Sequence, residues 1–197
     1  DFMPGLVVVQ VGDDPASTIY VNHKEKDCKK VHFHSEVYKL PADGTQQGII
    51  DQVQLLNKRH DVHGIIVQMP LPDGIDGQAV IDTISPEKDA DGLSPINLGN
   101  LLINREGVTP CTPTGVIRLI ESTGVEIEGK RVVCLGRSSL VGKPVGLMLL
   151  NRNATVTYCH TRTRNLVEET RNAEAFGLKF QPPEIDLNRI REWTRGV

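Results

Sequence analysis

The sequence lacks several features that would place it in a special class of protein. Its four cysteines are widely spaced and none forms a C-x-x-C pair, which argues against a zinc site or a disulfide framework. No apolar stretch reaches the roughly 18 residues that a membrane-spanning helix needs, and no repeat or low-complexity segment stands out. The net charge is only −3, so the composition gives no reason to expect nucleic acid or a membrane as a partner.

What remains is the composition of a globular protein, with 39% hydrophobic and 24% charged residues in a chain of 197. Cys134 and Cys159 sit inside apolar runs, which predicts buried free thiols in a reducing compartment. We therefore expect a cytoplasmic protein, with mitochondria left open. The start "DFMPGLVVVQ" does not have the layout of a signal peptide, and a chain whose natural N-terminus has been removed is an equal alternative.

Short β-branched runs alternate with longer amphipathic stretches. Strands are predicted over residues 5–12, 34–40, 64–72, 131–136 and 154–160, and helices over residues 16–31, 45–59, 77–84, 115–124 and 142–151. This alternation predicts the α/β class, with parallel sheets and βαβ crossovers. The stretch "EGVTPCTPTG", residues 106–115, is rich in proline and glycine, and we place a domain boundary just after it. A cleft between two α/β layers is the expected place for a ligand.

Residues 130–144, "KRVVCLGRSSLVGKP", have the form of a cofactor-binding turn between a strand and a helix. Gly136 and Ser138 are small enough to let phosphate approach the helix N-terminus. An NAD-binding turn is usually followed, about 20 residues on, by a carboxylate that binds the ribose. Here the next strand leads instead to Thr161 among basic residues, and Arg137 lies in the turn itself. Cations and hydroxyls suit a 2′-phosphate, which favours NADP over NAD; a plain connection is the alternative.

Polar residues in the first half form a second candidate site. Tyr20 and Lys24 are spaced i, i+4 on one face of a predicted helix, and Gln68 ends a predicted buried strand. Asp89 and Asp91 lie in the turn-rich loop "PEKDADG". The alternatives are a solvated Tyr–Lys pair, a hydrogen-bonded glutamine, and a solvated turn or helix cap. The histidines show no ligand spacing, so no metal site is predicted.

Taken together, the motifs carry a specific resemblance. "VGDDPAS…YVNHK", "VHGIIVQMPLP", "PEKDADGL", "PCTPTG", "GRSSLVGKP" and "ATVTYCHTRT" occur in this order. Over about residues 4–172 the chain resembles the bifunctional methylenetetrahydrofolate dehydrogenase/cyclohydrolase family. The resemblance implies a folate-binding domain, a Rossmann-like NADP-binding domain, an active site in the cleft between them, and a homodimer. It also implies tetrahydrofolate derivatives as substrates, with neither nucleic acid nor a membrane as a partner.

The resemblance further implies a NADP-dependent oxidation of 5,10-methylenetetrahydrofolate to the 5,10-methenyl cation, and hydrolysis of that cation to 10-formyltetrahydrofolate. By the same resemblance Tyr20 stacks on the folate, and Lys24 is the central acid–base group. Gln68 hydrogen-bonds to that lysine, and Asp91 anchors the amino edge of the pterin. An ammonium group would oppose the methenyl cation, so we expect Lys24 to be at least partly neutral, favoured by burial and a hydrogen bond from Gln68.

In the second half, the resemblance assigns Gly136 to the cofactor turn. It assigns Arg137, Ser138 and Thr161 to the 2′-phosphate of NADP. Family members often have serine where Thr161 stands, and the substitution keeps the hydroxyl.

The resemblance ends near residue 172. We predict a folate-binding catalytic domain over residues 1–114 and a partial Rossmann-like domain over residues 115–174, and we leave residues 175–197 unassigned. A truncated or spliced product, an altered C-terminus and a shortened chain would each explain this, and the first two predict weak or absent dehydrogenase activity. The alternatives in function are a catalytically weak or silent relative that only binds folate or a partner chain, and an unrelated NADP-dependent reductase. The segment "PPEIDLNRIREW" is expected to form a short helix over the sheet.

Overall fold

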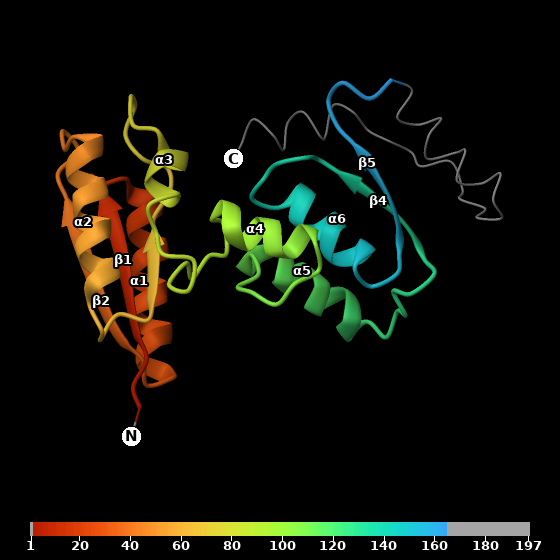
Figure 1. Ribbon diagram of the computed structural model, residues 1–197, viewed down its shortest axis with the longest axis horizontal. Coiled ribbons are helices and arrows are strands. Elements are labelled where there is room, and N and C mark those ends of the chain that lie inside the picture. Colours follow the sequence, from red (N-terminus) through yellow and green to blue (C-terminus); the bar gives the residue numbers. More distant parts are fainter. Residues whose placement is uncertain (1, 165–197) are drawn as a thin grey trace. The chain divides into compact units, whose positions relative to one another are not determined.

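The structure is a computed structural model that describes residues 2–164 (Figure 1). The chain divides into two units at the Tyr158–Cys159 peptide. The elements are β1 (Gly5–Val11), α1 (Pro15–Lys30), β2 (His34–Leu40), α2 (Gln46–Lys58), β3 (Gly64–Val67), α3 (Gly77–Ile81), α4 (Pro95–Leu102), α5 (Cys111–Ser122), β4 (Arg131–Leu135), α6 (Gly142–Leu150) and β5 (Thr155–Cys159). The predicted α/β class is confirmed. The helix expected in "PPEIDLNRIREW" lies outside the described residues.

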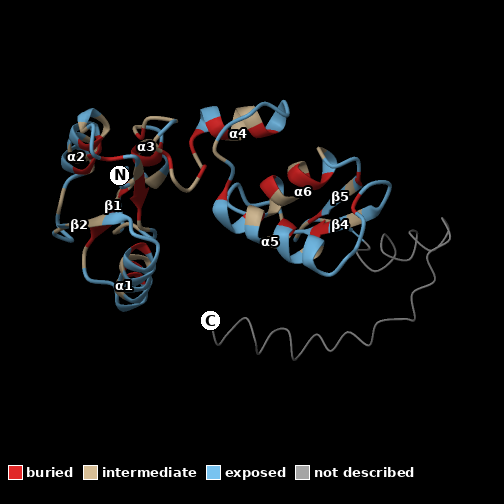
Figure 2. Cartoon of the chain, turned by 90° about the horizontal axis from the view of Figure 1, so that it is seen from below, coloured by how far each residue is buried: buried red, intermediate tan, exposed pale blue. Residues whose placement is uncertain are grey.

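The first sheet has three strands in the order β2-β1-β3, and β1 is parallel to both neighbours. Successive side chains of a strand point to opposite faces, so β1 contributes side chains to the packing on both faces of the sheet. Val7 and Val9 pack in one cluster with residues of α2, whereas Val8 packs with Val21 of α1. Figure 2 shows α1 and α2 on opposite sides of this sheet. A strand buried on both faces reads as a continuous apolar run, as "GLVVVQV" does.

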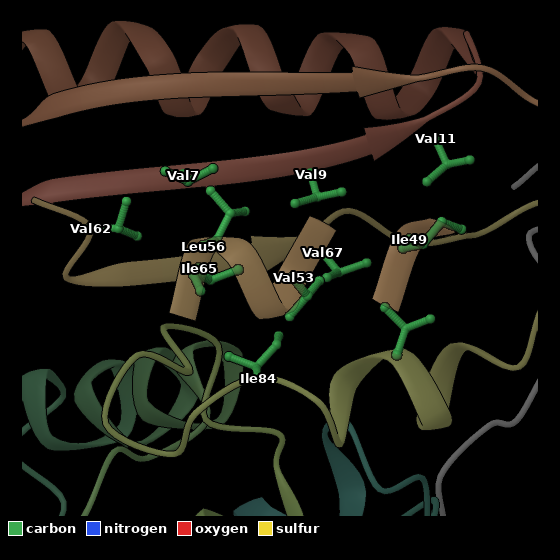
Figure 3. Packing of buried hydrophobic residues seen from close by; sticks show 11 residues of the cluster. Val7, Val9, Val11, Ile49, Val53, Leu56, Val62, Ile65, Val67 and Ile84 are labelled. Atoms are coloured by element: carbon green, nitrogen blue, oxygen red, sulfur yellow. The ribbon is translucent and has the colours of Figure 1, made fainter. Parts of the chain in front are cut away.

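The main core of the first sheet lies under α2. Ile49, Val53 and Leu56 recur at helical spacing along α2 and are at most 1% exposed. Figure 3 shows them packed against the valines of β1 and the apolar residues of β3. This packing fixes the carboxyl edge of the sheet, where β1 and β3 end side by side.

A second cluster joins α4, α5, β4 and α6. Its buried members are Leu101, Ile117, Ile127, Cys134, Met148, Leu149 and Ala154. β4 and β5 pair in one sheet, and α6 connects them along the chain, which gives a βαβ unit. Cys134 and Cys159 are both buried and free, as predicted.

Three elements differ from the sequence-based expectation. The strand predicted over residues 64–72 ends at Val67. The backbone N–H of Gln68 still donates to Val9 O at 2.9 Å, but the chain then enters prolines, which carry no N–H to continue the ladder. α4 was not expected, although Ser94 caps it and Pro95 opens it.

The third difference is α5, which begins at Cys111, inside the proline- and glycine-rich stretch expected to precede the domain boundary, and not at residue 115. The other predicted helices and strands agree with the structure to within three residues at each end.

Candidate functional site

Lys24 and Gln68 meet at the carboxyl edge of the first sheet. Lys24 lies in the middle of α1, and its Nζ donates a hydrogen bond to Gln68 Oε1 at 3.2 Å. The glutamine follows β3 directly and is fixed twice more: its backbone N–H donates to Val9 O at 2.9 Å, and its Nε2 donates to Met69 O at 2.8 Å. The expected contact between these two side chains is therefore present, while their roles stay predictions.

The direction of this hydrogen bond differs from the expectation. We expected a bond from Gln68 that favours a neutral Lys24, but the lysine is the donor and the amide oxygen is the acceptor. An ammonium group donates to an amide oxygen at least as well as a neutral amine does. This contact therefore orients Lys24 and does not by itself favour the amine.

Asp91 lies close enough to Lys24 for their charges to interact. Its carboxyl group is half-buried, and loss of water raises its pKa above the usual range, with the nearby positive charge of Lys24 opposing that rise and the negative charge of Asp89 adding to it. Tyr20, one turn before Lys24 on α1, is 63% exposed. α1, the end of β3 and the loop before α4 thus bring Lys24, Gln68 and Asp91 together, with Tyr20 one helical turn away.

Cys111, at the start of α5, belongs to the same cluster but was not selected from the sequence. Its Sγ donates to Ala90 O at 3.2 Å. Cys111 is exposed as a residue, but partial loss of water at its thiol raises the pKa of that group, the charge of Asp91 raises it further, and the charge of Lys24 opposes the rise. The only signal in the sequence is the motif "PCTPTG" that contains it.

Two buried polar atoms lie near the start of α1. Gln10 Oε1 and Ser17 Oγ have no hydrogen-bond partner among the residues that the structure describes, although both side chains are at most 4% exposed. Buried polar atoms are normally paired; here Gln10 Oε1 could only accept a hydrogen bond, whereas Ser17 Oγ could accept or donate one. Ser17 is one turn before Tyr20 on the same helix.

The turn between β4 and α6 is compact. A Cβ atom at Gly142 would lie 2.6 Å from Gly136 O, so the turn requires glycine there, and Gly136 itself has a φ of 121°. Ser138 Oγ accepts from the backbone N–H groups of Val141 and Gly142, each at 3.2 Å. The serine therefore stabilises the start of α6, while its O–H remains able to donate. Arg137 is exposed beside it.

Thr161 is exposed and follows β5 in a turn in which His160 N–H donates to Thr163 Oγ1 at 2.8 Å. It belongs to the second unit of the chain, and Arg137 and Ser138 belong to the first. Their common role at a 2′-phosphate stays a prediction.

Among residues 2–164 no group of three His, Cys, Asp or Glu side chains has the arrangement of a metal site. No helix of the described part is long and apolar enough to cross a membrane.

Comparison with known proteins decides the family. Residues 1–91 match the model of the tetrahydrofolate dehydrogenase/cyclohydrolase catalytic domain, and residues 110–177 match that of its NAD(P)-binding domain. The chain is 49% identical over 190 residues to the bifunctional protein FolD of Halalkalibacterium halodurans, which covers 96% of this chain and 68% of that protein. This chain belongs to the tetrahydrofolate dehydrogenase/cyclohydrolase family. The resemblance inferred from the motifs is confirmed.

Other members of the family are similarly close. The FolD protein of Moorella thermoacetica is 50% identical over 182 residues, which are 92% of this chain and 65% of that protein. The solved structure of the Trypanosoma brucei enzyme, complexed with NADP cofactor and inhibitor, has 43% identity and a TM-score of 0.77, and the match covers 82% of this chain and 55% of that one. This chain therefore spans between 55% and 68% of the length of these three relatives.

The surroundings of Cys111 predict how fast its thiol is alkylated. Because the pKa of its thiol is raised, less thiolate is present near neutral pH, and we expect iodoacetamide to alkylate Cys111 more slowly than a free cysteine. Asp91→Asn removes a negative charge that raises the pKa and should speed the reaction, whereas Lys24→Met should slow it. Peptide mass analysis against time measures all three rates. Equal rates in the three proteins would contradict the arrangement of charges described above.

Proposed function

We propose that this chain oxidises 5,10-methylenetetrahydrofolate in a NADP-dependent reaction and hydrolyses the resulting 5,10-methenyl cation to 10-formyltetrahydrofolate. The observation that carries the proposal is the hydrogen bond from Lys24 to Gln68, beside the half-buried carboxyl group of Asp91. The names of its relatives, bifunctional protein FolD, support it.

Two residues bind the substrate in this proposal. The exposed ring of Tyr20 offers a face on which the planar rings of a folate can stack. Asp91 accepts hydrogen bonds from the amino edge of the pterin. A carboxylate that accepts from a neutral donor makes a stronger bond than a neutral acceptor does, so Asp91 both binds the pterin and fixes its orientation.

Lys24 moves protons in the hydrolysis. Water adds to the methenyl carbon, and the neutral amine of Lys24 takes one proton from it. As the bond from this carbon to N5 breaks, the ammonium group returns that proton to N5, and the hydroxyl proton of the adduct goes to solvent. One water is consumed and one proton is released. Gln68 holds the lysine Nζ at the carbon throughout, because its amide is itself fixed by the backbone at the end of β3.

The turn at Gly136 fits a dinucleotide. No atom lies within 4 Å of the place where a Cβ of Gly136 would stand, which leaves room for a phosphate, and Ser138 keeps a hydroxyl proton free beside the N-terminus of α6. NADP, when bound, supplies the hydride acceptor of the oxidation. Arg137, Ser138 and Thr161 would hold its 2′-phosphate. The match of residues 110–177 to the NAD(P)-binding domain supports this assignment.

Replacing Arg137 with alanine tests the choice of cofactor. Loss of one charge-assisted hydrogen bond to a phosphate costs about 1.5–3 kcal/mol, so we expect the KM for NADP to rise about tenfold or more, while the KM for NAD stays unchanged. Steady-state kinetics with both cofactors measure this. The matched control is Arg118→Ala, which removes an exposed arginine of α5. An equal effect on both cofactors would contradict the assignment.

The domain limits, the homodimer and the cytoplasmic location belong to the same proposal. The two family matches, over residues 1–91 and 110–177, support the order of a folate-binding part followed by a nucleotide-binding part; the limits at residues 114 and 174 stay a prediction. Size-exclusion chromatography with light scattering tests the homodimer, for which a monomer at all concentrations is the contrary result.

Hydrolysis of 5,10-methenyltetrahydrofolate tests the proposed function. We expect the wild-type chain to speed the loss of the methenyl absorbance well above the rate in buffer, and to saturate with substrate. A chain that binds 5-formyltetrahydrofolate but leaves the hydrolysis rate at the buffer value would be a silent relative instead.

A further inference from the structure

The loop that carries Asp91 has no helix or strand of its own. It runs from the end of α3 at Ile81 to the start of α4 at Pro95. Among residues 2–164, none donates a hydrogen bond to the Asp91 carboxylate, which interacts there through charge alone. The direction of this carboxylate therefore depends on how the loop itself is held.

Asp89, two residues earlier, connects the loop to α4. Its Oδ2 atom accepts the backbone N–H of Ser94 at 2.7 Å and the side-chain Nδ2 of Asn97 at 2.9 Å. The same Nδ2 donates to Pro86 O at 2.8 Å, which closes the loop on itself. Asp89, Ser94 and Asn97 are all at most 3% exposed. Buried charge-assisted hydrogen bonds of this kind hold a fixed geometry, since breaking them leaves a carboxylate without water or a partner.

The backbone of the loop is held from two other sides. Ile65 N–H donates to Lys88 O at 2.7 Å, and Ala90 N–H donates to Ile65 O at 3.3 Å, so residues 88 and 90 pair with β3. On the opposite side Cys111 Sγ donates to Ala90 O. These contacts use backbone atoms of the loop, and the Asp89 side chain makes the connection to α4.

From this arrangement we infer that Asp89 is a positioning residue for substrate binding. Its buried hydrogen bonds to Ser94 and Asn97 hold the loop against α4 and so fix the direction in which Asp91 presents its carboxylate to the folate. The inference rests on the proposed role of Asp91 in folate binding. Asp89 itself touches no substrate, and its effect passes through Asp91.

The variants separate the hydrogen bonds of Asp89 from its charge. One oxygen accepts both bonds, so the amide oxygen of Asp89→Asn can accept the same two donors, whereas Asp89→Ala loses both. Asn97→Asp sets a second carboxylate against the first and breaks the contact. Adding Asp89→Asn to Asn97→Asp relieves this repulsion and should restore the contact in part.

The test measures the Kd of 5-formyltetrahydrofolate and the KM values for folate substrate and NADP. Losing a charge-assisted contact predicts that Asp89→Ala and Asn97→Asp each raise the folate Kd about tenfold, with the KM for NADP unchanged. Asp89→Asn should stay within about threefold of wild type, and the double variant should recover most of the affinity lost in Asn97→Asp. In an Asp91→Ala background, Asp89→Ala should add less than about twofold, since its effect passes through Asp91.

The control variant is Asp76→Ala. Asp76 accepts from the backbone N–H groups of Gln78 and Ala79 at the start of α3, so its loss also removes a carboxylate with two hydrogen bonds, but outside the loop between α3 and α4, and the folate Kd should not change. A folate Kd that Asp89→Ala and Asn97→Asp leave at the wild-type value overturns the inference, as does a full additional effect of Asp89→Ala in the Asp91→Ala background. A wild-type chain that does not bind 5-formyltetrahydrofolate overturns the proposed function, and this inference with it.

Discussion

Lys24→Met is expected to lower the rate of 5,10-methenyltetrahydrofolate hydrolysis by about 10²–10⁴-fold, the range that one positioned acid–base group supplies. Methionine keeps the length and the apolar stem of lysine but has no nitrogen to take a proton from water or to return it to N5. The hydrogen bond to Gln68 Oε1 at 3.2 Å is lost as well. Binding of 5-formyltetrahydrofolate should remain measurable, because Tyr20 and Asp91 are unchanged. The two measurements are the rate of methenyl hydrolysis and the Kd of the folate.

Lys29→Met is the matched control for that variant. Lys29 lies on the same helix and pairs at the exposed surface with Glu25 at 3.0 Å, so its replacement removes the same group away from the site. Exposed pairs contribute little to stability, and hydrolysis should proceed at the wild-type rate. Full hydrolysis in Lys24→Met, or an equal loss in Lys29→Met, would show that Lys24 is not the acid–base group.

Gly92→Ala is expected to destabilise the chain by roughly 2–5 kcal/mol, combining the cost of a left-handed backbone with that of overpacking. Gly92 has a φ of 67°, and a Cβ atom there would lie 2.6 Å from Thr109 C and 2.7 Å from Pro110 N. Both neighbours are backbone and cannot move aside as a flexible side chain could. Relief of the clash would push the Asp91 loop away from the start of α5. We therefore expect weaker folate binding together with a lower free energy of unfolding in urea.

Gly74→Ala separates the two contributions. Gly74 also has a positive φ, 86°, but a Cβ atom there would meet nothing within 4 Å. This variant should lose only the conformational part, about 1–2 kcal/mol, and should bind folate as the wild type does. If Gly92→Ala lowers the free energy of unfolding no more than Gly74→Ala does, the close approach of the loop to the segment before α5 does not require glycine at position 92.

Local sequence patterns were sufficient to predict most elements of the first sheet and its helices. The continuous apolar run of β1, the helical spacing of Ile49, Val53 and Leu56, and the Thr45 cap of α2 are all visible in the sequence, and the structure follows them closely. The Lys24–Gln68 contact could be predicted because the family resemblance pairs the two positions. Residue spacing alone could not pair them, since they are 44 residues apart.

Other parts of the site depend on tertiary contacts that no local pattern encodes. Cys111 joins the cluster because α5 starts inside the proline- and glycine-rich stretch, four residues before the helix that the sequence predicts from residue 115. Asp89 and Asp91 look alike in "PEKDADG", yet one is buried in a network with α4 and the other is half-exposed toward Lys24. Whether a side chain lies inward or outward on an irregular loop is decided by its partners, which lie on other elements.

The most direct test of the proposed function is NADPH formation by the wild-type chain with 5,10-methylenetetrahydrofolate and NADP. The oxidation needs the folate site and the turn at Gly136 at the same time, so NADPH formation tests folate binding and cofactor binding together. We expect a rate that saturates with both substrates and depends on enzyme concentration. A chain that binds 5-formyltetrahydrofolate but forms no NADPH above the blank would contradict it.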